Sequence, residues 1–187
     1  MKAIRLIALA ACMAATLDAS AQEQEIRLFS HRGGRMEHDE NTLSAFQASY
    51  DAGYRGFETD IRMTRDGALV ITHDSSLERT TDGTGTVEEK TEAEIRQLAT
   101  KQGNKMMFLD ELLEFLKGKE GLYVEFEMKT KPEVLYPEER LHAYCDKLYD
   151  AVMAVKPADA TFVFTSGDYR GLRYLQAKHP GVDLLLI

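Results

Sequence analysis

Two histidines stand where short apolar segments end in this chain of 187 residues. His31 directly follows Ile26–Ser30, and His73 closes the segment Ala68–His73. An imidazole titrates near neutral pH, so one histidine can accept a proton while another donates one. The two residues therefore predict acid–base catalysis at a site to which both segments contribute.

Carboxylates recur at alternate positions in two other apolar segments. Glu58 and Asp60 are two residues apart, so on a strand both side chains point to the same face. Glu127 and Lys129 have the same spacing. Ionised carboxylates that are buried together are costly unless a cation neutralises them, and hard oxygen ligands suit Mg²⁺ or Ca²⁺. We therefore expect Glu58, Asp60 and Glu127 to bind a divalent metal, either Ca²⁺ or Mg²⁺.

Positive charge suited to a phosphate lies next to these residues. Arg32 and Lys129 carry hydrogen-bond donors and no acceptors, which is what a phosphate group requires. Gly33 and Gly34 would let the backbone come close to that phosphate. Histidines, acids and bases at the ends of strands together predict metal-assisted hydrolysis of a phosphodiester.

Strand-like and helix-like periodicities alternate along the chain and predict the elements that position these residues. The expected strands are Ile26–Ser30, Gly56–Met63, Ala68–His73, Leu122–Met128, Thr161–Thr165 and Asp183–Ile187. The expected helices are Thr42–Ala52, a short one opened by the capping box Thr91–Glu94, Asp110–Lys117, Glu138–Val155 and Asp168–Lys178. This order predicts an α/β fold with a mostly parallel sheet, whose strand ends carry the site.

Two features depart from a regular strand–helix alternation. The connection between Asp60 and His73 is too short for a helix and contains the turn Arg65-Asp66-Gly67. The chain also stops within an apolar strand, which leaves a sheet edge uncovered. We therefore expect about six strands of a longer, C-terminally truncated barrel.

The charged elements resemble a known signature. They are His31-Arg32-Gly33-Gly34, Glu40-Asn41-Thr42, Glu58-Thr59-Asp60, His73-Asp74, Arg79-Thr80-Thr81-Asp82-Gly83-Thr84-Gly85 and Glu127-Met128-Lys129. In order and spacing they are similar to the glycerophosphodiester phosphodiesterase family. That resemblance implies a (β/α)8 TIM barrel, a divalent metal, and hydrolysis of a small-molecule glycerophosphodiester to glycerol 3-phosphate and an alcohol.

The resemblance also assigns roles to individual residues. It implies His31 and His73 as the catalytic acid–base pair, Arg32 and Lys129 as ligands of the substrate phosphate, and Glu58, Asp60 and Glu127 as metal ligands, with Glu40 in support. Two other functions remain open. A truncated or degenerate barrel would bind a phosphodiester or a partner without turnover, and a related phospholipase would act on another head group.

The N-terminal segment has the pattern of an export signal. Lys2 and Arg5 precede a short apolar run, and Ala19-Ser20-Ala21 supplies small residues at the cleavage spacing. We expect residues 1–21 to be a signal peptide, residues 22–187 to be the partial barrel domain, and the protein to be secreted or periplasmic. The alternative is a lipoprotein anchored through Cys12, because Leu9-Ala10-Ala11-Cys12 resembles a lipoprotein box.

Composition excludes several classes of function. The formal net charge is −8 and the sequence pI is about 5.2, so no global basic field is present to hold nucleic acid. Two cysteines are too few for a disulfide framework. The apolar run near the N-terminus is shorter than the ~20 residues that a bilayer-spanning helix needs, so we expect no transmembrane segment.

Overall fold

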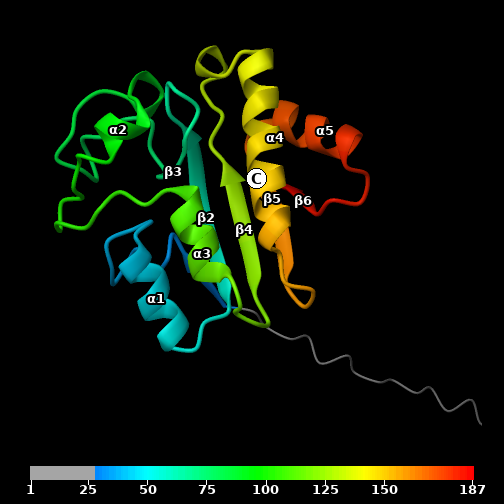
Figure 1. The fold of residues 1–187 in the computed structure, drawn as a ribbon, viewed down its shortest axis with the longest axis horizontal. Coiled ribbons are helices and arrows are strands. Elements are labelled where there is room, and N and C mark those ends of the chain that lie inside the picture. Colours follow the sequence, from blue (N-terminus) through cyan, green and yellow to red (C-terminus); the bar gives the residue numbers. More distant parts are fainter. Residues whose placement is uncertain (1–27) are drawn as a thin grey trace, which may run out of the picture.

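The computed structural model describes residues 28–187, in which six strands form one sheet (Figure 1). The strands are β1 (Phe29–His31), β2 (Gly56–Met63), β3 (Leu69–Ile71), β4 (Tyr123–Met128), β5 (Thr161–Ser166) and β6 (Leu184–Leu186). Their order is β1-β2-β4-β5-β6, all in parallel pairs, and β3 pairs with β2 in the antiparallel sense. The antiparallel strand explains the short connection between Asp60 and His73, because a turn suffices to reverse the chain.

Helices alternate with the parallel strands, as the periodicity predicted. They are α1 (Leu43–Asp51), α2 (Glu92–Ile95), α3 (Leu109–Leu116), α4 (Glu138–Val155) and α5 (Tyr169–Lys178). Capping residues set several of the starts. The side chain of Thr42 accepts a hydrogen bond from the amide of Ala45, Thr91 forms the predicted capping box, and Asp168 caps α5.

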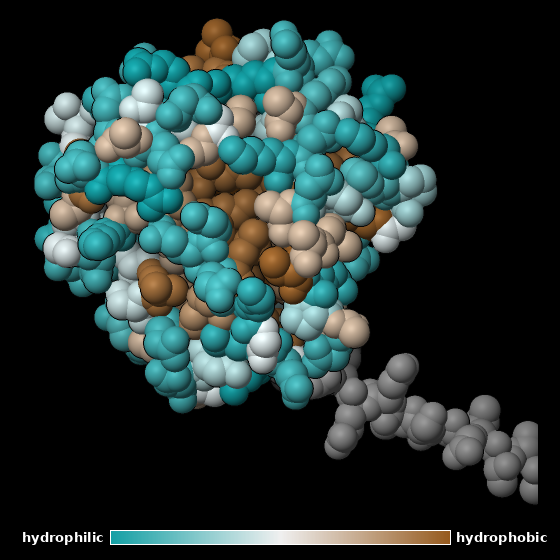
Figure 2. Space-filling model, viewed as in Figure 1, coloured by the Kyte–Doolittle hydropathy of each residue, from teal (hydrophilic) through white to brown (hydrophobic). Residues whose placement is uncertain are grey.

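The helices cover one face of the sheet and leave the other face to polar side chains. Figure 1 shows α3 and α4 in front of the strands and α1 beside α3, and the core between helices and sheet includes Phe46, Phe57, Leu112, Phe126 and Tyr144. The outer surface of this helical layer is mostly hydrophilic in Figure 2, apart from a hydrophobic strip across its middle. Apolar contacts therefore hold the helical layer in place and leave the opposite face free for charged groups.

This architecture confirms the predicted α/β fold with six strands. Within residues 28–187 the sheet is open, with β1 and β6 at its two edges. Among these residues no helix is both long and apolar enough to cross a bilayer. The predicted signal peptide, residues 1–21, and the alternative anchor at Cys12 lie outside the described residues.

Gly56 lets β1 and β2 approach each other closely. A Cβ atom at this position would lie 2.6 Å from the carbonyl oxygen of Leu28. Since backbone cannot move aside without shifting β1, we expect Gly56→Ala to lower the free energy of unfolding by about 1–3 kcal/mol. Urea denaturation measures this, with Gly171→Ala as the control. A Cβ at Gly171, on α5, would make ordinary contacts of 3.4–3.7 Å with Cys145, Met128 and Leu141, so the control is expected to be neutral or slightly stabilising.

Candidate active site

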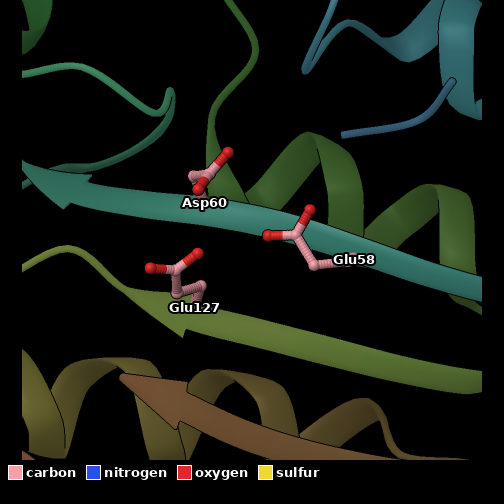
Figure 3. A group of neighbouring side chains, drawn as sticks. All are labelled: Glu58, Asp60 and Glu127. Carbon is pink, nitrogen blue, oxygen red and sulfur yellow. The ribbon is translucent and has the colours of Figure 1, made fainter. Parts of the chain in front are cut away.

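Three carboxylates meet on the face of the sheet that the helices do not cover (Figure 3). Glu58 and Asp60 lie on β2 and Glu127 lies beside them on β4, where Asp60 and Glu127 are direct register partners. One oxygen of each carboxylate lies within 4.8 Å of one oxygen of each of the other two. The alternation of side chains along two paired strands therefore creates the predicted cluster.

Burial makes this cluster electrostatically costly by itself. Asp60 is fully buried, and Glu58 is 8% exposed. Burial, followed by the charges of Asp60 and Glu127, raises the pKa of Glu58 to about 8. A cation between these groups would relieve the repulsion that disfavours their ionised forms.

The residues present fit a divalent metal. Glu58 Oε1 and Asp60 Oδ1 are buried and have no hydrogen-bond partner, so both retain the lone pairs that a metal would use. Opposite ligands lie about 4 Å apart around Mg²⁺ and about 5 Å apart around Ca²⁺, and the spacing of the cluster suits a small oxygen-liganded ion of this kind. Glu58, Asp60 and Glu127 are therefore a candidate metal site.

The two predicted phosphate ligands lie against the same carboxylates. Lys129 Nζ is 2.5 Å from Glu127 Oε1 and 3.4 Å from Asp60 Oδ1. Arg32 Nε is 3.3 Å from Asp60 Oδ2, its Nη1 donates to Glu40 Oε1 at 3.1 Å, and its amide donates to Glu58 Oε2 at 3.0 Å. Both positive charges are thus at the carboxylate cluster, where they can meet an anionic substrate.

The two histidines reach the site from different strands. His31 is the last residue of β1, and its Nε2 lies 3.5 Å from Glu58 Oε2. The pKa of His31 is lowered, first by burial and then by the charges of Arg32 and Arg35. His73 lines a cleft of about 270 Å³ together with Glu127 and Lys129. Both imidazoles therefore belong to the region of the carboxylates.

Local backbone geometry explains the loop after β1. Gly33 and Gly34 have φ values of 75° and 106°, and a Cβ at Gly33 would lie 3.1 Å from atoms of Ala45 and Phe46. Arg32 itself has a φ of 53°, which is unusual for a residue with a side chain. The glycines thus allow this loop to turn tightly against α1, a packing reason beyond the phosphate contact expected from the sequence.

Asn41 is a site residue to which the sequence reasoning assigned no role. Its Nδ2 donates to Asp60 Oδ2 at 2.8 Å, and its φ of 58° is one that asparagine tolerates better than most residues. It therefore fixes the orientation of the Asp60 carboxylate. The only indication of this role in the sequence is the position of Asn41 in the element Glu40-Asn41-Thr42, just before the start of α1.

A buried ion pair supports the backbone around His73. Arg62 Nη1 donates to Glu88 Oε1 at 2.7 Å, and Arg62 Nε donates to the carbonyl of His73 at 2.9 Å. Glu88 also accepts from Ser75 at 2.6 Å and from Tyr136 at 3.1 Å. This network was not predicted from the sequence, because neither Arg62 nor Glu88 belongs to the charged elements that resemble the family signature.

Comparison with known proteins decides the family. The sequence model of the glycerophosphoryl diester phosphodiesterase family matches residues 31–187. The chain belongs to this family. Its match therefore begins at the first predicted catalytic residue, His31, and continues through every element of the site.

Individual relatives agree with this assignment. A glycerophosphodiester phosphodiesterase of Caldanaerobacter subterraneus is 37% identical over 123 residues, which cover 61% of this chain and 50% of the relative. A human glycerophosphodiester phosphodiesterase 1 is 44% identical over 73 residues, which are 39% of this chain and 22% of the relative. An Oleispira antarctica phosphodiesterase, whose structure is known in complex with the product sn-glycerol-3-phosphate, is 26% identical, with a TM-score of 0.74. That match covers 86% of this chain and 64% of the other. The chain thus spans between a fifth and two thirds of these relatives.

Metal binding at the carboxylates should raise thermal stability. An ion that binds only the folded state contributes about 2.7 kcal/mol at 100 times its Kd, so Ca²⁺ or Mg²⁺ should raise Tm and EDTA should reverse the rise. Asp60→Asn should abolish the shift, and Asp110→Asn, at an exposed position on α3, should keep it. An equal rise in Tm in the Asp60→Asn variant would show that the ion binds elsewhere. Differential scanning fluorimetry measures the change in Tm.

The ion pair beneath His73 should contribute to stability. Glu88→Ala leaves the buried Arg62 guanidinium without its charged partner, so we expect the free energy of unfolding to fall by about 3–5 kcal/mol. Glu114→Ala, which removes an exposed pair with Lys117, should have little effect. Equal effects of the two substitutions in urea denaturation would contradict the role of the buried pair.

Proposed function

We propose that the protein hydrolyses glycerophosphodiesters to glycerol 3-phosphate and an alcohol, with a divalent metal and the histidines His31 and His73. Membership of the family supports the reaction class, and the structure of a related phosphodiesterase holds the product sn-glycerol-3-phosphate. One observation of this chain carries the proposal. Three carboxylates, two of which keep a buried oxygen without a hydrogen-bond partner, lie together with two imidazoles and two basic side chains on or just after the strands of one sheet.

The metal would be held by Glu58, Asp60 and Glu127. When bound, such an ion supplies positive charge that stabilises the charge developing on phosphoryl oxygens. Lys129 is flexible enough to move from Glu127 to a phosphate oxygen once a metal shares the charge of the carboxylates. Arg32 stays anchored by Glu40 and offers a fixed positive charge.

The proton transfers fall to the two histidines. His31 lies next to the carboxylates, and His73 lines the cleft that also contains Glu127 and Lys129. Hydrolysis of a diester needs a base for the attacking hydroxyl and an acid for the departing alkoxide. Two imidazoles reaching the site from different strands can serve the two sides of the phosphorus centre.

Removing either histidine should stop turnover without unfolding the protein. In the whole protein that contains this chain, we expect His31→Ala and His73→Ala each to lower kcat for glycerophosphocholine by about 10²–10⁴-fold. Release of glycerol 3-phosphate, coupled to its dehydrogenase, measures the rate. His142→Ala is the matched control, because His142 lies on α4 and stacks on Tyr174.

The outcomes separate the alternatives. Normal release of glycerol 3-phosphate by either variant would contradict the histidine roles. Absence of turnover by the wild-type protein, with every diester of a panel and either metal, would favour a barrel that only binds. Turnover of choline- or inositol-bearing lipids in place of glycerophosphodiesters would indicate the phospholipase function.

A further inference from the structure

A continuous chain of opposite charges crosses the mouth of the site. It runs Asp60–Arg32–Glu40–Arg79–Asp74–His73. Asp60 and Arg32 form an ion pair at 3.3 Å, and each later residue is joined to the next by a side-chain hydrogen bond. The first members come from β2 and the loop after β1, and the last three lie at the end of β3 and in the segment that follows it. The chain of charges therefore links the loop that follows His31 to the segment that carries His73.

Arg79 is the central link of this chain. Its Nη2 and Nη1 donate to the two oxygens of Glu40 at 2.7 and 3.0 Å, and its Nε donates to Asp74. Although 47% of the side chain is exposed, each of its three nitrogens is engaged by a carboxylate. A guanidinium committed in this way is held rigidly and has little capacity left to bind substrate.

Glu40, the carboxylate that binds two nitrogens of Arg79, is anchored in the protein interior. Glu40 is only 13% exposed at its side chain, and it also accepts from Arg32, which is 9% exposed. An isolated surface ion pair contributes little, but this one joins a fixed network through a bidentate contact. Arg79 therefore restrains the position of Asp74 relative to the loop after β1.

Asp74 determines which nitrogen of His73 carries the proton. Its Oδ1 lies 2.6 Å from Nδ1 of His73. The hydrogen bonds from Arg79 and His73 lower the pKa of Asp74 to about 2, so the carboxylate is ionised and can only accept. Nδ1 must then be the donor, which leaves Nε2 of the neutral imidazole free to take a proton.

We propose that Arg79 is a positioning residue that acts through Asp74 to hold His73 in its Nδ1–H form. The proposal rests on the proposed hydrolysis and assigns a function to the otherwise irregular segment after β3. Arg79 does not touch the reacting atoms in this account. Its loss should therefore slow the chemical step and leave substrate binding nearly unchanged.

Kinetics of paired variants in the whole protein test this. We expect Arg79→Met to lower kcat for glycerophosphocholine by about 10–100-fold, as for other groups that orient a functional side chain, with KM within threefold. Arg79→Lys should lie between it and the wild type. Arg79→Met should have no further effect in an Asp74→Asn background, because the two residues act in series. Arg65→Met, which removes an exposed guanidinium paired with Glu94, should behave as wild type.

A spectroscopic measurement tests the same proposal without turnover. Long-range ¹H–¹⁵N spectra should show the neutral ring of His73 protonated at Nδ1 in the wild type, and a shift toward the Nε2–H form in Arg79→Met. If the wild type fails to turn over any diester, the proposed hydrolysis is wrong and these spectra still decide the role of Arg79. A KM increase with unchanged kcat, a multiplied effect in the double variant, or an unchanged tautomer in Arg79→Met would each overturn the proposal.

Discussion

Repulsion among three buried carboxylates is the constraint around which the site is organised. Parallel pairing of β2 and β4 sets Asp60 directly beside Glu127, and alternation along β2 adds Glu58 on the same face. Such a cluster is unfavourable by itself, as the raised pKa of Glu58 shows. Positive charge must therefore be supplied at this point, and Arg32, Lys129 and a divalent ion are the groups suited to supply it.

The hydrophobic core and the carboxylate cluster lie on opposite faces of the sheet. The helices pack their apolar faces on one side of the sheet, where Phe57 and Phe126 are buried. The same strands present their charged residues to the other side, so β2 and β4 serve both layers at once. Arg32 lies next to Asp60, and Glu40 lies next to Arg32, so each of these buried groups has an opposite charge as its neighbour.

Much of this arrangement is predictable from the sequence because it follows from short-range periodicity. The spacing of Glu58 and Asp60 requires a common face on any strand, and the bounds predicted for the longest helix, Glu138–Val155, agree with α4. The order and spacing of the charged elements, which resemble those of the family, indicate that elements far apart in the sequence share one site.

Other contacts were not predictable because they depend on irregular segments. Arg79 and Glu88 lie in the segment between β3 and α3. This segment is held by isolated β-bridges, so its sequence has little of the hydrophobic periodicity that predicts strands and helices. Asn41 has its role through a left-handed backbone conformation, which composition and spacing do not reveal. The turn Arg65-Asp66-Gly67 was predicted, but the antiparallel pairing of β3 with β2 that it allows was not, because hydrophobic alternation does not specify strand direction.

The most direct test of the central claim is to locate the ion itself. A crystal structure of the whole protein grown with Mn²⁺, solved with anomalous scattering data, would show where a divalent ion binds. We expect one strong anomalous peak within coordination distance of Glu58, Asp60 and Glu127, with Lys129 displaced from Asp60. A peak elsewhere, or Lys129 still bridging Asp60 and Glu127 at saturating Mn²⁺, would contradict it.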